Sequence, residues 1–287
     1  MTSHNQINAT QDIVQQLPGE VVAHIASYTD NESLNNLRLA SQDAADKTAS
    51  EFAKRHLKVL DLKLPVTKEE SFDSGLPCPL LDEEFSTTVK FIEQNDLGGY
   101  VQRITFSEES DQDDFSIECR IRLRIFFLQL TSLRAISVKF QCVPAAKFFL
   151  SFLATVPKIP LTELSLHGAS INSASQLMPV LRNFAASLNR IHFEGVRMPR
   201  KDWIRVFNYI RDGMNVNRLC LYKVQATEDK DDEMLLDSVL PENEQYYVCD
   251  PESKEWWHIT KEFTIMHGQA GVKDGLGDVI TLMERVS

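Results

Sequence analysis

Histidine, cysteine and carboxylate side chains are the groups in this chain that could bind a metal ion or catalyse a hydrolysis. Their spacing matches no familiar arrangement for either chemistry. The chain lacks a C-x-x-C pair, a G-x-S-x-G elbow, a phosphate loop and an H-E-x-x-H motif. Its seven histidines do not stand at metal-ligand spacing; they are His4, His24, His56, His167, His192, His258 and His267. We therefore expect no metal site, no cofactor and no catalytic residue.

Two other stretches resemble ligand loops only superficially. Residues 108–114 alternate carboxylates with other residues, but they lack the glycine and the distant glutamate of a calcium loop, so we expect a solvated loop. Residues 268–278 hold four glycines without a preceding strand or the G-x-G-x-x-G spacing, and we expect a flexible tail. An enzyme in the C-terminal region, a hydrolase or transferase, is the weakest hypothesis. It requires a pocket that joins His258 or His267 to a nucleophile and a carboxylate.

The composition limits the kinds of partner and the cellular compartment that we expect for this chain. The formal net charge is −11 and the isoelectric point is near 5.2, which argues against nucleic acid because phosphate binding needs a basic footprint. No apolar run approaches the roughly 18 to 20 residues that span a bilayer, and the polar N-terminus does not resemble a signal peptide. The five cysteines are odd in number and widely scattered, as expected of reduced thiols. We expect a cytoplasmic or nuclear protein, or one found in both, that binds no membrane.

The N-terminal segment reads as a group of short helices. Pro18 suits a first helical turn, and Val21, Val22, Ile25 and Tyr28 then recur at helical spacing. Asp30 is a good N-cap for a second helix that carries Leu34 and Leu37. Ser41 could cap a third, with its apolar face at Ala44, Ala45, Thr48, Ala49 and Phe52. A segment of this size buries little apolar surface on its own. It is therefore either a docking module for another protein or a cap on a larger fold.

The residue types in this segment favour the docking module. Leu17-Pro18-x-Glu20-Val21-x-x-x-Ile25-x-x-Tyr28, followed by Leu34-x-x-Leu37-Arg38-Leu39-Ala40-Ser41, resembles the F-box motif of many fungal F-box proteins over about residues 12–60. An F-box docks on the Skp-type linker of a cullin–RING ubiquitin ligase. The resemblance implies that six residues contact that linker: Leu17, Pro18, Val21, Ile25, Leu34 and Leu37.

A repeat organises the rest of the chain. Five apolar-x-apolar segments start 32, 28, 27 and 28 residues apart: Ile104-Thr105-Phe106, Ile136-Ser137-Val138, Leu164-Ser165-Leu166, Ile191-His192-Phe193 and Leu219-Cys220-Leu221. Leu60-Asp61-Leu62 is an earlier copy. Over about residues 58–225 this pattern resembles degenerate leucine-rich repeats of the F-box type, which place a strand and a helix in each repeat. The alternative is a generic α/β domain with coincidental spacing.

Helix patterns fill three of the intervals between the predicted strands, over residues 145–156, 173–188 and 202–211. Residues 119–130 are ambiguous because Ile121, Leu123 and Ile125 alternate with arginines as in a strand, but their place in the repeat favours a helix. The expected fold class is therefore α/β. We expect a three-helix F-box at 12–57, then an irregular solenoid at 58–225 with parallel strands on its concave face and a loop insertion at 65–81. Residues 226–287 should form an acidic linker, a capping hairpin of 246–249 with 256–259, and the flexible tail.

The repeat also predicts a binding surface. Residues between the apolar strand positions should point out of the concave face in three rows. The client-binding candidates in those rows are Arg103, Lys139, His167, Arg190, His192, Glu194, Arg218 and Tyr222. Residues 190–223 hold eight basic and three acidic residues, which favours an acidic or phosphorylated client. We expect the substrate receptor of a Skp–cullin–F-box ligase, which catalyses nothing itself; the alternative is a ligase-independent repeat scaffold.

Overall fold

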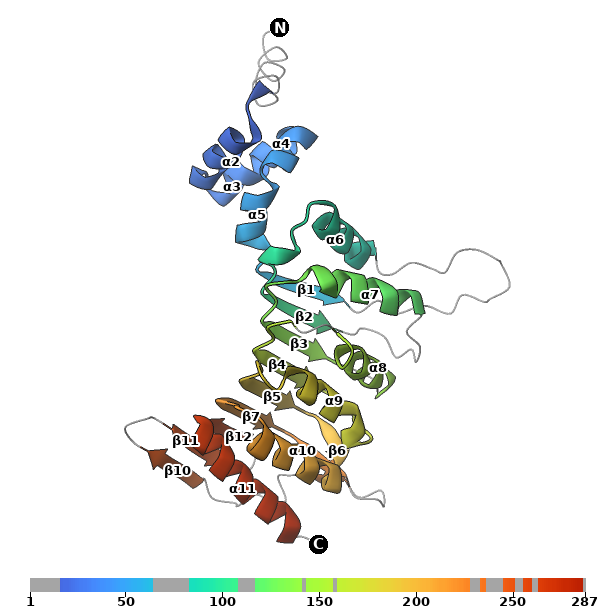
Figure 1. Ribbon diagram of the computed structural model, residues 1–287, viewed down its shortest axis with the longest axis vertical. Helices are drawn as coiled ribbons and strands as arrows, with labels where there is room; N and C mark the ends of the chain where they lie inside the picture. Colours follow the sequence, from blue (N-terminus) through green and yellow to red (C-terminus); the bar gives the residue numbers. More distant parts are fainter. Residues whose placement is uncertain are drawn as a thin grey trace, which may run out of the picture.

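The computed structural model describes residues 16–63, 83–107, 117–140, 143–156, 159–227, 233–235, 245–250, 255–259 and 263–285 (Figure 1). The first residues of the predicted F-box, the loop insertion at 65–81 and the acidic stretches at 108–114 and 228–232 lie outside these ranges. None of the described helices is long and apolar enough to cross a membrane.

Four short helices form one end of the molecule (Figure 1): α2 (Gly19–Tyr28), α3 (Asn31–Ala40), α4 (Gln42–Lys47) and α5 (Ala49–His56). Both predicted caps are present, since the Asp30 side chain accepts a hydrogen bond from the Ser33 amide and Ser41 Oγ accepts one from the Ala44 amide. The prediction of three helices is wrong. The third divides at Thr48, a buried residue whose hydroxyl donates to the Ala44 carbonyl at 2.7 Å.

A nine-stranded, mostly parallel sheet forms the centre of the structure. The strands β1 (Val59–Lys63), β2 (Arg103–Ser107), β3 (Ala135–Lys139), β4 (Glu163–His167), β5 (Arg190–Glu194) and β7 (Arg218–Tyr222) lie side by side in that order, all parallel. The antiparallel strands β12 (Phe263–His267), β11 (Glu255–Ile259) and β10 (Gln245–Asp250) continue it. The predicted hairpin is therefore confirmed as β10 and β11. A second, three-stranded sheet joins β6 (Arg197–Pro199), β8 (Gln225–Thr227) and β9 (Glu233–Leu235).

One helix follows or precedes almost every strand: α6 (Glu83–Gln94), α7 (Ile117–Gln129), α8 (Val143–Leu153), α9 (Ala174–Phe184), α10 (Arg200–Gly213) and α11 (Gln269–Arg285), with a short turn of 3₁₀-helix at Gly98–Tyr100. Figure 1 shows these helices along the same side of the sheet. The buried strand residues meet them there. Phe106 of β2, for example, packs on Phe127 of α7 and Phe149 of α8. The residues that alternate with the buried ones stay partly exposed on the opposite face, which we call the strand face.

The prediction of a flexible C-terminal tail is wrong, because residues 269–285 form helix α11. Val272, Leu276 and Val279 recur at helical spacing and are buried, as are Gly271 and Gly275. Glycine in a helix interior costs about 1 kcal/mol relative to alanine. Burial of one whole apolar face of α11 against α10 and the last strands outweighs that cost.

Candidate docking sites

Helix α2 divides into a buried face and an exposed apolar face. Val22 and Ala26 are buried, whereas Val21, Ile25 and Tyr28 are 42%, 48% and 79% exposed. These three residues are spaced four and three apart, so they form one row on the outside of the helix. Leu39 of α3, which is 84% exposed, adds a further apolar side chain to this end of the molecule.

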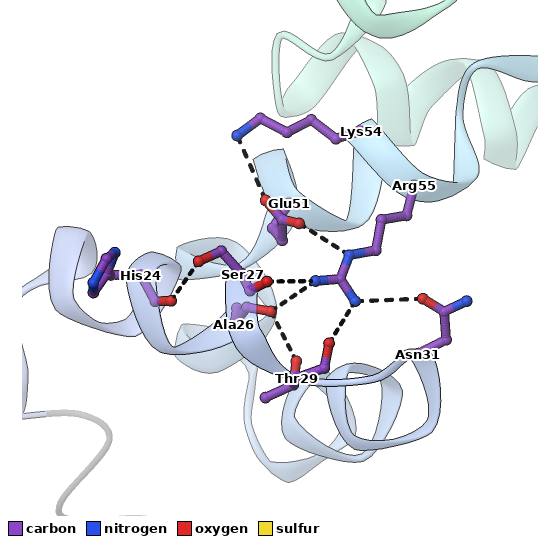
Figure 2. Close-up of polar contacts among 8 residues, drawn as sticks. All are labelled: His24, Ala26, Ser27, Thr29, Asn31, Glu51, Lys54 and Arg55. Carbon is purple, nitrogen blue, oxygen red and sulfur yellow. Dashed lines mark hydrogen bonds and ion pairs between the residues drawn. The ribbon is translucent and has the colours of Figure 1, made fainter.

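The side chain of Arg55 anchors α2 to α5 (Figure 2). Its guanidinium donates to the carbonyl oxygens of Thr29 at 2.8 Å, Ala26 at 3.0 Å and Ser27 at 3.2 Å, and lies 3.4 Å from Asn31 Oδ1. The last carbonyls of a helix have no partner within the helix and carry its partial negative charge. A cation at this point therefore both satisfies the carbonyls and stabilises the C-terminus of α2.

Glu51 holds Arg55 in this position. Its Oε1 accepts from Arg55 Nε at 2.9 Å, and its Oε2 lies 3.5 Å from Lys54 Nζ (Figure 2). The hydrogen bond from Arg55 is the main reason that the pKa of Glu51 is lowered from its ordinary value. Since Ala53 of α5 belongs to the same hydrophobic core as Leu60 of β1, α2 is linked through Arg55 and α5 to the sheet.

Arg38 lies inside the helical end and joins it to α6. Its guanidinium stacks over the ring of Phe52 at 4.3 Å and lies 5.8 Å from the ring centre of Phe91, while Nη1 donates to the Ala45 carbonyl at 2.8 Å. Burial lowers the pKa of Arg38. The arginine of the Leu-Arg-Leu segment is therefore a packing residue in this fold.

The six residues predicted to contact a Skp-type linker fall into three groups. Pro18, Val21 and Ile25 are exposed, and Leu17 and Leu37 are partly exposed. Leu34 is completely buried, and its selection as a contact residue is wrong for this conformation because its side chain faces the interior of the helical end. Tyr28 and Leu39 are exposed apolar residues that the prediction left out. The spacing of apolar residues identifies the apolar face of a helix, but it does not show whether other parts of the same protein cover that face.

The strand face brings the predicted client-binding residues into the three expected rows. The first row aligns Arg103, Ala135, Glu163, Arg190 and Arg218; the second aligns Thr105, Ser137, Ser165, His192 and Cys220; the third aligns Ser107, Lys139, His167, Glu194 and Tyr222. The prediction of these rows is confirmed. Repeats of nearly equal length put equivalent positions side by side when parallel strands pair without a shift.

Two arginines of the first row contact one carboxylate, that of Glu163. Arg103 binds Glu163 through two hydrogen bonds, of 2.9 and 3.0 Å, across Ala135, whose small side chain leaves room between the two strands. Arg190 Nη1 is 3.9 Å from the same carboxylate, and Arg218 is next in the row. The hydrogen bonds from Arg103 are the first cause of a lowered pKa at Glu163, and the charges of Arg190 and Arg218 lower it further. The row keeps a positive excess.

His167, His192 and Glu194 form a second cluster between the second and third rows. His167 Nδ1 lies 2.8 Å and His192 Nε2 lies 3.9 Å from Glu194 Oε2, and the two rings meet edge to face at 5.2 Å. Burial is the main cause of a lowered pKa at His192. Sequence spacing missed this grouping because His167 lies in one repeat and His192 and Glu194 lie in the next, so no local ligand motif contains all three.

Lys139 and Tyr222 belong to the third row and lie on either side of the histidine cluster. Lys139 is exposed, and the Tyr222 ring lies 5.1 Å from Lys223 Nζ. The two histidines in the enzyme hypothesis lie on neighbouring strands, His258 on β11 and His267 on β12. His267 is exposed and is the register partner of Arg218. All eight predicted client-binding residues thus share the strand face. Six of them form the arginine row and the histidine cluster, and Lys139 and Tyr222 flank the cluster.

Comparison with known proteins assigns neither a family nor an activity. No protein-family model matches the chain, and no curated protein matches it. Among solved structures, the spore cortex-lytic enzyme SleL of Bacillus megaterium QM B1551 is similar at 14% sequence identity, with a TM-score of 0.25. That match covers 83% of this chain and 64% of the enzyme's chain. At this level of similarity it carries no argument about function.

Proposed function

We propose that this chain is the substrate-recognition subunit of a Skp–cullin–F-box ubiquitin ligase. In this proposal, helices α2–α5 are the F-box and dock on the Skp-type linker, while the strand face of a leucine-rich-repeat-like region binds the client. The chain is a non-catalytic adaptor that holds its client near the ubiquitin-charged enzyme, which raises the client's effective concentration there. The observation that carries the proposal is the exposed apolar row of Val21, Ile25 and Tyr28 on α2.

The distribution of exposed apolar residues supports a docking surface at the helical end. In the described part of the chain, the large apolar residues that are exposed are Val21, Ile25, Tyr28, Leu39, Val59, Ile121, Ile125 and Leu128. Half of them lie on α2 and α3. Exposed apolar side chains that gather at one place are typical of protein–protein contacts. The contacts of Arg55 hold α2 in position before any partner arrives, which lowers the entropic cost of docking.

The docking step is tested by charge substitution on α2. The Val21→Asp, Ile25→Asp double variant should lose co-purification of the Skp-type linker and the cullin, because two carboxylates would have to be buried at the interface. Ile121→Asp, Ile125→Asp on α7 is the matched control, since it makes the same change at two residues of similar exposure elsewhere. Equal recovery of the linker with both double variants, each folded by circular dichroism, would contradict the docking role.

The arginine row supports an acidic or phosphorylated client. Arg103 is paired with Glu163, but Arg190 makes only a 3.9 Å contact with that carboxylate and, like Arg218, is exposed. Planar guanidinium groups bind carboxylates and phosphates through paired hydrogen bonds. We expect Arg190→Glu, Arg218→Glu to lose binding to arrays of acidic and phosphorylated peptides. The control is Arg124→Glu, Lys147→Glu, which makes the same change of charge at exposed positions on the helices and should keep the peptide binding. Equal loss of peptide binding in both double variants would refute a local site.

A ligase-independent scaffold is the second candidate function. The observation that favours it is the continuous core between α5 and β1, which lets the helical end cover the first strand as a cap. The two functions separate in the same purification. Under the scaffold hypothesis, neither wild type nor Val21→Asp, Ile25→Asp recovers a cullin, while the peptide binding of the strand face is unchanged.

A further inference from the structure

The histidine cluster on the strand face has the composition and geometry of a metal site. His167, His192 and Glu194 each offer one ligand atom, and these atoms all lie within 4.8 Å of one another. From this arrangement we infer that the three residues bind a divalent transition-metal ion, with zinc as the ion that best fits two imidazoles and one carboxylate.

Two of the distances between the ligand atoms lie on either side of the value for a tetrahedral site. Zinc lies about 2.0–2.2 Å from histidine nitrogen and carboxylate oxygen, so two of its ligand atoms are about 3.3 Å apart. His167 Nδ1 and His192 Nε2 lie 2.8 and 3.9 Å from Glu194 Oε2. One distance is shorter and one longer than the ideal value. All three ligand atoms lie within 4.8 Å of one another, so rotations of the side chains, with the strands unmoved, would draw them together around one ion.

The backbone holds these side chains on one face. His167 of β4 and Glu194 of β5 are register partners on neighbouring parallel strands, and His192 precedes Glu194 by two residues. All three side chains therefore point to the same side of the sheet. Their position is set by paired strands in the centre of the sheet and not by a loop, which favours a site that exists before the ion binds.

Ser137 supplies the outer contact that histidine ligands usually have. Its Oγ lies 3.2 Å from His167 Nε2, the ring nitrogen that faces away from Glu194. When Nδ1 binds the ion, the proton of the neutral ring lies on Nε2 and can be donated to the serine oxygen, which fixes the ring and its tautomer. The single proton of the neutral ring is thus on Nε2 when the ion is bound at Nδ1, so a neutral His167 binds the ion without releasing a proton.

The three residues leave one coordination position open toward solvent. A tetrahedral ion has four ligands, and His167, His192 and Glu194 are each partly exposed, so a water molecule or a ligand group can take the fourth place. The site is separate from the docking surface on α2 and from the paired Arg103 and Glu163. Metal binding is measured on the chain alone, so its outcome does not depend on the proposed ligase function.

The test is a titration of the untagged full chain with zinc chloride by isothermal calorimetry. We expect one saturable zinc per chain at micromolar affinity or tighter. His192→Ala and Glu194→Gln should each weaken binding by at least about tenfold, since each removes one ligand of three. Cys220→Ser and His24→Ala are the controls. The first removes the neighbouring thiol and the second an exposed histidine of α2, and both should bind zinc as wild type does.

A cobalt titration provides a second readout that does not rely on heat. The visible absorption of Co²⁺ bound to nitrogen and oxygen ligands should appear with wild type and Cys220→Ser, and be lost in His167→Ala, His192→Ala. Absence of saturable zinc binding to wild type would overturn the inference. So would equal zinc affinity in wild type, His192→Ala and Glu194→Gln, because the ion would then be bound elsewhere.

Discussion

Removal of the Arg55 side chain should release helix α2 from the rest of the protein. In Arg55→Ala, the carbonyls of Ala26, Ser27 and Thr29 lose a cationic donor at 2.8 to 3.2 Å, and Glu51 loses its 2.9 Å partner. The arginine side chain is only 21% exposed, so these bonds are shielded from most of the competing water. The substitution should therefore act mainly on the local stability of the helical end.

The expected cost follows from the individual contacts. A hydrogen bond to a charged group contributes about 1.5–3 kcal/mol, and a cation at a helix C-terminus about 0.3–2 kcal/mol. These values overlap because the same carbonyls account for both effects, and water replaces part of the lost bonding. We therefore expect a loss of about 2–3 kcal/mol, which corresponds to roughly 30- to 160-fold more frequent opening of α2.

Hydrogen exchange followed by mass spectrometry measures this opening in peptides from residues 19–28. The control is Lys54→Ala, because Lys54 neighbours Arg55 but is 57% exposed and makes one 3.5 Å contact with Glu51. An exposed pair of this kind is worth less than about 1 kcal/mol, so exchange should change by a few-fold at most. Protection of α2 in Arg55→Ala equal to that in Lys54→Ala would refute the assignment of Arg55 as the anchor of this helix.

Two further substitutions test the sheet. Gly168→Ala should destabilise the fold by about 1–3 kcal/mol in thermal unfolding, because Gly168 has a φ of +69° and an added Cβ would lie 2.6 Å from the Phe140 carbonyl oxygen. Gly277→Ala, where the surrounding space is open, is the control and should not destabilise; equal losses would contradict the steric argument. Glu163→Gln should change the acid dependence of the unfolding temperature. The pKa of Glu163 is lowered in the fold, first by the hydrogen bonds from Arg103, so its contribution to stability is present above the unfolded pKa and is lost as pH falls through the folded one. Wild type should exceed Glu163→Gln in stability at pH 7, and the difference should shrink between about pH 5 and pH 2; a difference independent of pH would show that the ion pair does not contribute.

Local patterns in the chain predicted the strands and the helix caps well. Alternation of apolar residues marked each parallel strand, although the same alternation at Ile121, Leu123 and Ile125 lies in helix α7. The equal spacing of the segments from Ile136 to Leu219 predicted which residues become neighbours. Asp30 and Ser41 cap their helices because a cap needs only the backbone of the next three residues. The C-terminal helix was missed because its glycines argue against a helix locally, whereas the apolar face that stabilises it is buried against distant segments.

The alignment of equivalent strand positions and the type of most elements, helix α11 excepted, were therefore determined by the sequence itself. Both depend on contacts within a few residues or on a constant repeat length. Only the tertiary structure decided which apolar residues of the helical end stay exposed, because Leu34 and Tyr28 share the same pattern and differ in what packs over them. The tertiary structure also determined which residues of the candidate sites come together. Arg55 meets the end of α2 from more than twenty residues away, and His167 meets Glu194 from the next repeat. Such contacts are formed by the packing of the whole sheet and its helices, and no short stretch of sequence records them.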